Sequence, residues 1–150
     1  MTERGSTKRL KPNAPLDEEA ARANARKFAI DAARHAANTR CTNVVVLDLV
    51  GLSPVCDFFV IATGTSARQM RTVADELTEL AEQRKFAPLA SSGYEGESWI
   101  LVDCVDVVVH IFNAQTRGYY DLDNLWGDAK PVQWQASDAA TPDNAEKPAR

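Results

Sequence analysis

The acidic residues and the histidine in the second half of the chain are the side chains whose types could do chemistry. Asp103 and Asp106 are separated by two residues, Asp121 and Asp123 by one, and His110 lies between the two pairs. Closely spaced carboxylates can hold magnesium ions, and histidine can act as a general base or a metal ligand. The chemistry to test first is therefore metal-dependent phosphoryl or nucleotidyl transfer.

The spacing of these residues argues against that chemistry. Nucleotidyltransferases of the polymerase-beta type carry Gly-Ser between a strand and a helix, followed by Asp-x-Asp on the next strand. Here Gly64-Thr65-Ser66 reaches a predicted helix, but Asp121-x-Asp123 lies beyond the predicted strands, and no Gly-Lys-Thr/Ser pattern marks a P-loop. The sequence therefore predicts no catalytic residues, no metal site and no cofactor.

Cysteine and histidine offer no other reactive set. Cys41, Cys56 and Cys104 form no C-x-x-C pair, and each lies in or beside an apolar run. They are predicted to be small core residues in a reducing compartment. With two histidines and no clustered cysteines, a zinc site is not expected. No apolar run is long enough to span a membrane, so we expect a cytoplasmic protein.

Hydrophobic periodicity predicts the elements that would position these residues. The alanine-rich segment 16–38 predicts a helix with Asp17 as its N-cap, and Ser66 with Gln69 predicts a capping box for a second helix ending near residue 85. A third, short helix is predicted over 120–126, with Leu122, Leu125 and Trp126 inward. The predicted strands are 43–49, 57–63, 88–91, 99–103 and 107–112.

This order predicts an α/β fold, a single domain with a mixed β-sheet of about five strands packed by helices. The strand 57–63 is apolar without alternation, which indicates a central position covered on both faces. We expect the domain to cover residues 16–134, between a disordered arm, 1–15, and a disordered tail, 135–150.

Charge is distributed unevenly along the chain. The net charge is −4, yet the first 40 residues hold nine Lys and Arg against five acids. Between Phe86 and Ala129 there are seven acidic residues and one basic residue, Arg117. The acidic region suits a basic partner and disfavours nucleic acid. RNA binding through the basic arm stays open as an alternative.

Two residues of the apolar strands have both a structural and a functional interpretation. Trp99 either packs the sheet or anchors an interface, because tryptophan desolvates a large area and keeps an N–H donor. Alternation places His110 on one face with Val108 and Phe112, where a hydrogen-bonded structural role is favoured over a ligand role.

Several motifs in order resemble the ribosomal silencing factor S family, also called Iojap, over about residues 18–132. They are Leu47-Asp-Leu-x-Gly51-Leu-Ser53, Asp57-Phe-Phe-Val-Ile-Ala-Thr-Gly-Thr-Ser-x-Arg68-Gln69, Gly93-Tyr-Glu-Gly96 with Trp99-Ile-Leu-Val-Asp103, Asp106-Val-Val-Val-His-Ile-Phe112, and Tyr120-Asp-Leu-x-x-Leu-Trp-Gly-Asp128.

The resemblance implies a domain related to the nucleotidyltransferase fold but without its catalytic carboxylates. It also implies binding to the large ribosomal subunit through ribosomal protein L-fourteen, which blocks joining of the small subunit and lowers translation when nutrients are short. The family can form homodimers. No membrane partner and no sequence-specific nucleic acid are expected.

Ribosomal proteins are commonly basic, so the acidic region is the natural contact surface. Trp99 is the expected anchor of this surface. The predicted partner-binding residues are Tyr94, Glu95, Trp99, Asp103, Asp106, His110, Tyr120 and Asp121. A metal-dependent nucleotidyltransferase-like enzyme is the alternative that this hypothesis must exclude.

Overall fold

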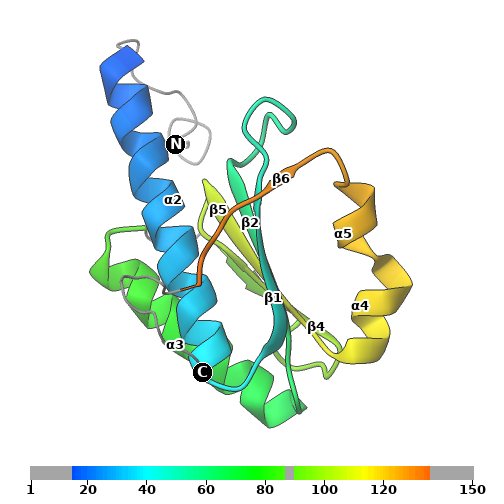
Figure 1. The fold of residues 1–150 in the computed structure, drawn as a ribbon. Helices are drawn as coiled ribbons and strands as arrows, with labels where there is room; N and C mark the ends of the chain where they lie inside the picture. Colours follow the sequence, from blue (N-terminus) through cyan, green and yellow to red (C-terminus); the bar gives the residue numbers. More distant parts are fainter. Residues whose placement is uncertain (1–14, 87–89, 136–150) are drawn as a thin grey trace, which may run out of the picture.

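Residues 15–86 and 90–135 are described by a computed structural model, in which helices lie on both faces of one mixed sheet (Figure 1). The elements in chain order are α2 (Pro15–Asn38), β1 (Thr42–Asp48), β2 (Phe58–Thr63), α3 (Ala67–Gln83), β3 (Ala90–Ser92), β4 (Trp99–Asp103), β5 (Val107–Phe112), α4 (Ala114–Tyr120), α5 (Leu122–Leu125) and β6 (Lys130–Pro131). The predicted arm and tail lie outside the described residues, except for Pro15 and Gln135, and so do Pro88 and Leu89.

The sheet has six strands in the order β3-β4-β5-β2-β1-β6. β2 and β5 run parallel, and every other neighbouring pair is antiparallel. The predicted α/β class and mixed sheet are confirmed, and β2 is central as expected. The expected count of about five strands misses β6, which pairs with β1 only at Leu47–Pro131 and Asp48–Lys130. A two-residue strand containing proline leaves no periodic signal.

The two faces of the sheet are covered to different extents. α2 and α3 pack on one face, where alternate strand residues such as Val46, Val60 and Ile100 are fully buried. α2 meets this face through Phe28 and five alanines, all fully buried: Ala25, Ala29, Ala32, Ala33 and Ala36. Figure 1 shows α4 and α5 on the opposite side of the sheet. There Val45 and Phe59, the sequence neighbours of the buried positions, stay partly exposed.

The capping prediction is confirmed at the start of α3. Ser66 has an extended backbone, and its side chain accepts a hydrogen bond from the Gln69 backbone N–H at 3.1 Å. The Gln69 side chain accepts from the Thr65 backbone N–H and donates to the Thr39 carbonyl at 2.7 Å. Gln69 therefore fastens the start of α3 to the end of α2.

The predicted N-cap of the first helix is wrong. α2 already begins at Pro15, so Asp17 lies inside the helix rather than in front of it. Proline suits the first turn of a helix, because its missing N–H has no intrahelical partner there. The alanine content correctly predicts the body of the helix but does not mark its first residue.

The segment between β5 and β6 differs most from the prediction. Instead of one helix over 120–126, α4 precedes Asp121, whose left-handed backbone (φ 52°) separates it from α5. Leu122 and Trp126 pack against the sheet as predicted, but Leu125 is 71% exposed, so its predicted inward position is wrong. The left-handed residue rotates α5 so that Leu125 points away from the sheet.

Gly93 brings the turn after β3 close to the first residue of β4. Its φ is +78°, and a Cβ atom added there would lie 1.9 Å from the Trp99 carbonyl oxygen. Gly93→Ala is therefore expected to lower the free energy of unfolding by about 1–2 kcal/mol, measured by urea denaturation. Gly118→Ala is the control, since an added Cβ meets nothing within 4 Å in helix α4. Equal destabilisation by both changes would contradict this role of Gly93.

Candidate functional site

The less covered face of the sheet carries a run of aromatic side chains, which we call the aromatic cluster. Its members come from β2, β4, β5 and the segment of α4 and α5: Phe59, Trp99, His110, Phe112, Tyr120 and Trp126. Trp99 stacks on Phe112 with ring centroids 4.8 Å apart and contacts the Tyr120 ring at 4.9 Å. Because Trp99 is only partly buried and Tyr120 is 49% exposed, this part of the cluster reaches the surface.

A hydrogen bond fixes the orientation of the Trp99 indole. Its Nε1–H donates to His110 Nδ1 at 3.2 Å. Indole nitrogen is a donor only, so His110 Nδ1 must be the acceptor and the ring proton must lie on Nε2. His110 Nε2 is buried and has no hydrogen-bond partner among the described residues. His110 thus lies with Val108 and Phe112 on one face, as the alternation predicts. From this buried position its ring accepts the hydrogen bond of the Trp99 indole.

Burial keeps the His110 ring neutral. The residue is 4% exposed, and desolvation lowers its pKa from 6.5 to about 4. The neutral ring is the form that can accept the Trp99 hydrogen bond, because a protonated ring carries hydrogen on both nitrogens. The hydrogen bond between Trp99 and His110 is therefore maintained at neutral pH.

Stability should fall in acid because of this histidine. Between pH 6.5 and about 4 the unfolded chain binds a proton at His110 that the folded chain excludes, so unfolding becomes easier as pH falls. At pH 4.5 the loss relative to pH 7 is about 2–3 kcal/mol. Urea unfolding of wild type and His110→Gln at both pH values measures this contribution, which the variant should lack. His35→Gln, a partly exposed control, should retain it; a loss unchanged in His110→Gln would contradict the assignment.

Arg117 holds α4 and α5 against the end of the sheet, and sequence reasoning missed this role. Its Nη1 donates to Thr63 Oγ1 at 2.9 Å and to the Asn43 carbonyl. Its Nε and Nη2 donate to the two carboxylate oxygens of Asp123 at 3.3 and 3.0 Å. The side chain is 12% exposed, and that of Asp123 is 37% exposed. The sequence feature that could have indicated this contact is a single arginine within an acidic stretch.

The structure brings only part of the predicted site together. Trp99 contacts both His110 and Tyr120, and Asp121 follows Tyr120 directly. Asp103 shares the strand face of Trp99 but lies four residues further along β4, about 13 Å away. Asp106 lies in the turn next to Asp103, at the same end of the sheet. The two carboxylates therefore occupy a separate position from the aromatic cluster.

Tyr94 and Glu95 lie in the exposed turn between β3 and β4. The Tyr94 hydroxyl donates to Asp75 on α3 at 3.0 Å, and this hydrogen bond raises the pKa of the phenol. Tyr94 thus points toward the α3 side of the sheet. Asn113, the N-cap of α4, donates from its side chain to the Glu97 carbonyl at 3.0 Å. This contact places the acidic turn beside α4.

Two carboxylates near the site are hydrogen-bonded, and the three thiols are buried. Asp103 accepts from the Val105 backbone N–H at 2.9 Å, and Asp121 accepts from Asn124 at 2.7 Å. Within residues 15–86 and 90–135, no three His, Cys, Asp or Glu side chains are placed to hold a metal ion. The three cysteines are free and buried, and burial raises the pKa of Cys104 to about 12. The prediction that they are core residues is confirmed.

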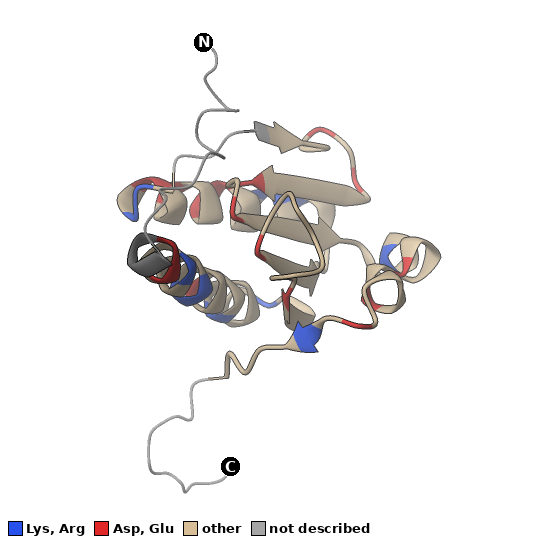
Figure 2. Ribbon diagram, turned by 90° about the horizontal axis from the view of Figure 1, so that it is seen from above, with Lys and Arg blue, Asp and Glu red and all other residues tan. Residues whose placement is uncertain are grey.

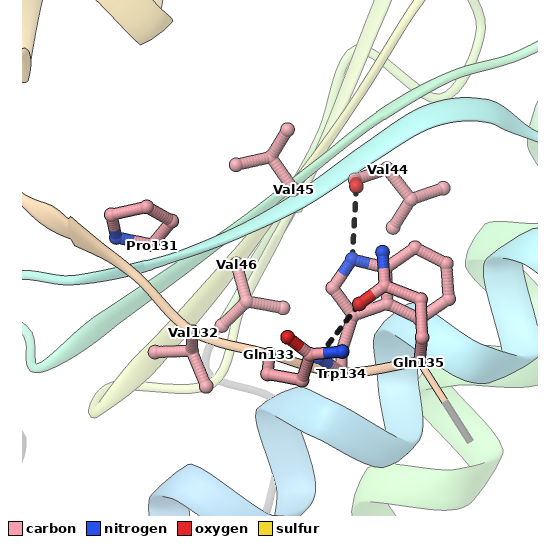
Figure 3. A pocket seen from close by; sticks show the side chains of 8 residues that line it. All are labelled: Val44, Val45, Val46, Pro131, Val132, Gln133, Trp134 and Gln135. Atoms are coloured by element: carbon pink, nitrogen blue, oxygen red, sulfur yellow. Dashed lines mark hydrogen bonds between the residues drawn. The ribbon is translucent and has the colours of Figure 1, made fainter. Parts of the chain in front are cut away.

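A pocket of about 380 Å³ lies away from the aromatic cluster, between β1 and the segment that contains β6 (Figure 3). None of its lining residues is charged. They are Val44, Val45, Val46, Pro131, Val132, Gln133, Trp134 and Gln135. Trp134 Nε1–H donates to the Val44 carbonyl at 3.0 Å, and Arg34 Nε donates to the Trp134 carbonyl at 2.7 Å. Trp134 is therefore a packing residue that ties this segment to β1 and α2.

Comparison with known proteins identifies the group to which this arrangement belongs. Residues 22–150 match the family described as "Ribosomal silencing factor during starvation". The chain belongs to the ribosomal silencing factor family. It is 40% identical to ribosomal silencing factor RsfS of Halalkalibacterium halodurans over 94 residues, which cover 63% of this chain and 80% of the relative. It is also 30% identical to the chloroplastic protein Iojap of Arabidopsis thaliana, covering 93% of this chain and 57% of that one.

Solved structures of similar proteins agree with the fold. A crystal structure of a protein from Chromobacterium violaceum has a TM-score of 0.62 and 34% identity, covering 77% of this chain and 92% of that one. A second, from Bacillus halodurans, has a TM-score of 0.59 and also 34% identity, covering 71% and 94%. The family resemblance seen in the sequence motifs is confirmed. No helix in the described part of the chain is long and apolar enough to cross a membrane.

Proposed function

We propose that this member of the ribosomal silencing factor family binds the large ribosomal subunit through ribosomal protein L-fourteen. Bound there, it prevents the small subunit from joining and represses translation when nutrients are limiting. Family membership supports the general role. The observation that carries the proposed binding mode is the partly exposed Trp99, held by His110, Phe112 and Tyr120 at the surface of the sheet.

Trp99 has the properties of an interface anchor. Its orientation is already fixed by a hydrogen bond and by ring stacking, so little side-chain entropy is lost when a partner covers it. Aromatic residues in preformed positions contribute much of the binding energy of protein interfaces. In our proposal the exposed part of Trp99 and the neighbouring Tyr120 form the centre of the contact. The buried His110 does not touch the partner but holds the Trp99 indole through its hydrogen bond.

The charge around this centre suits a basic protein. Glu95 and Glu97 are exposed in the adjoining turn, and Asp121 lies beside Tyr120. Arg117, the basic residue of this region, is largely buried and paired with Asp123, so it does not offset the surface carboxylates. Opposite charge on the partner would accelerate association and fix its orientation.

An interface of ordinary size centred on Trp99 reaches only part of the proposed contact set. About 800 Å² on each partner corresponds to a patch roughly 28 Å across. Asp103, about 13 Å from Trp99, lies within that reach, whereas Asp106 lies further away, beyond the end of β4. Glu95 would contact the partner from the turn between β3 and β4, whereas the Tyr94 side chain points toward α3. The inhibition itself is steric, because a folded domain occupies a surface that the small subunit needs.

Sucrose-gradient sedimentation of purified subunits tests the proposal. The protein should co-sediment with large subunits, not with small ones, and it should reduce the fraction of joined ribosomes. Large subunits lacking L-fourteen should no longer retain it. The proposal would be rejected if the protein did not bind large subunits, or if it bound them without reducing their association with small subunits. Magnesium-dependent ATP turnover lost in Asp103→Asn would favour a nucleotidyltransferase-like enzyme instead.

The proposal extends to a homodimer and to a cytoplasmic location. A homodimer formed through the aromatic cluster would compete with L-fourteen, because one surface cannot bury two partners at once. Light scattering with increasing L-fourteen should then show the dimer replaced by a one-to-one complex. A cytoplasmic protein meets both its ribosomal partner and the reducing conditions that suit three buried free cysteines.

A further inference from the structure

We propose that a second surface, formed by α2 and the start of α3, binds the phosphodiester backbone of RNA without reading its sequence. We call it the basic face, and it consists of Arg26, Lys27, Arg34, Arg40 and Arg68. It belongs to the helices that cover the opposite side of the sheet from the aromatic cluster. The inference therefore does not rest on the proposed protein contact.

The helical repeat aligns part of this face. Lys27 and Arg34 are seven residues apart, close to two turns, and Asn38 follows one turn later, so the three share one side of α2. Arg26 flanks this line and is exposed. The line from Lys27 to Asn38 is about 16 Å long. Figure 2 shows Lys and Arg on successive turns of α2.

A hollow of about 410 Å³ lies at the end of this line, where α2 ends and α3 begins. Its lining combines guanidinium groups with hydroxyl and amide groups: Asn38, Thr39, Arg40, Ser66, Arg68, Gln69 and Thr72. Arg40 and Arg68 are both exposed at its rim. The hydroxyls of Thr39 and Thr72 and the amide of Gln69 already donate to protein atoms. The guanidinium groups of Arg40 and Arg68 are therefore the main donors that this hollow offers to phosphate oxygens.

The nearby carboxylates do not neutralise the basic face. Asp31 is paired with Arg84 at 2.6 Å, and Glu76 is hydrogen-bonded to His35 at 2.6 Å. Glu18 and Glu19 lie eight and seven residues before Arg26, about two turns away along α2. In the described part of the chain, none of the five basic residues forms an ion pair. Arg34 is partly buried and uses its Nε–H for the Trp134 carbonyl, so the charges available to an external anion are chiefly those of the four exposed residues, Arg26, Lys27, Arg40 and Arg68.

The composition of the face favours RNA over an anionic membrane. Four of its five residues are arginine, whose planar fork binds phosphate oxygens in pairs. The other exposed residues on this part of α2 are small or polar, such as Ala20, Ala23 and Asn24. A helix that inserts into a lipid surface needs large apolar side chains beside its basic ones. Between Glu18 and Asn38, no large apolar side chain of α2 is exposed.

Binding of the full chain to a labelled RNA duplex of about 20 base pairs tests the inference, with affinity measured at several salt concentrations. Lys27→Glu and Arg40→Glu should each weaken binding at low salt by about fivefold or more and lower the salt slope by about one. Lys130→Glu is the matched control, because it makes the same charge change at an exposed residue of β6. It should alter affinity less than about twofold.

Three results would overturn the inference. They are no measurable binding of the wild-type chain to the duplex at low salt, an equal loss of affinity in Lys130→Glu, and equally tight binding to phosphatidylserine vesicles. Trp99→Ala should leave RNA affinity unchanged while it weakens binding to L-fourteen. A failure of the protein contact and a failure of the RNA contact are therefore distinguished by different variants. Circular dichroism should confirm that each variant retains its helices.

Discussion

Trp99→Ala is expected to weaken binding to large ribosomal subunits by about 30-fold or more, because an anchoring tryptophan contributes about 2 kcal/mol or more to an interface. The substitution removes the exposed ring and leaves His110 Nδ1 without its donor. It also removes the stack on Phe112, so stability should decline as well. Co-sedimentation gives the binding loss, and urea denaturation shows whether the variant is folded at the assay temperature.

Three further variants separate the contributions of Trp99. Trp99→Phe keeps an aromatic ring on Phe112 but loses the hydrogen bond to His110, so an intermediate loss is expected. Combining Trp99→Ala with Asp106→Lys should abolish co-sedimentation, because it adds a like charge against a basic partner. Leu52→Ala, at a residue 45% exposed in the β1–β2 loop, is the control and should bind normally. Unchanged binding by a folded double variant would reject the proposed surface.

Arg117→Ala is expected to lower the free energy of unfolding by about 2–3 kcal/mol. The change removes the bonds to Thr63 and Asn43 and leaves the Asp123 carboxylate unpaired. Because Asp123 is 37% exposed, water compensates part of this loss, which keeps the effect below that of a fully buried pair. Urea denaturation measures the change, and hydrogen exchange should show faster exchange of amides in α4 and α5.

Matched substitutions test whether the shape of the arginine matters. Arg117→Lys should restore little stability, because an ammonium group cannot donate in three fixed directions to Thr63, Asn43 and Asp123. Asp123→Asn should cost less than Arg117→Ala, since the contacts with Thr63 and Asn43 remain. An Arg117→Ala protein that unfolds at the wild-type urea concentration would show that α4 and α5 do not depend on this contact.

The elements with strong periodic patterns could be predicted from the sequence. Alanine content predicts α2, β-branched runs predict β1, β2 and β5, and the Ser66–Gln69 spacing predicts the start of α3. α4 was missed because Gly118 and two tyrosines give a weak helical signal, and tertiary contacts of Arg117 hold it instead. β6 was missed because it is defined by pairing with β1, which no local pattern encodes.

The residues of the candidate site and their strand face could be predicted from the sequence, but their contacts with distant parts of the chain could not. Alternation places Trp99 and His110 on one face, and the structure shows the hydrogen bond that joins them. The direction of Tyr94 depends on Asp75, nineteen residues earlier in the chain, so it could not be derived from strand periodicity. The role of Arg117 likewise depends on Asn43 and Thr63, which are distant in sequence.

The parallel pairing of β2 with β5 affects how the chain reaches its fold. Val60 lies opposite Val109, 49 positions later, so the centre of the sheet closes only after a long loop has been ordered. Such non-local pairing slows folding relative to local hairpins. During synthesis, β1 and β2 emerge long before β5, and one edge of β2 stays open until Phe112 has been made. The apolar edge of β2 must therefore be kept from aggregating until β5 has been made and can pair with it.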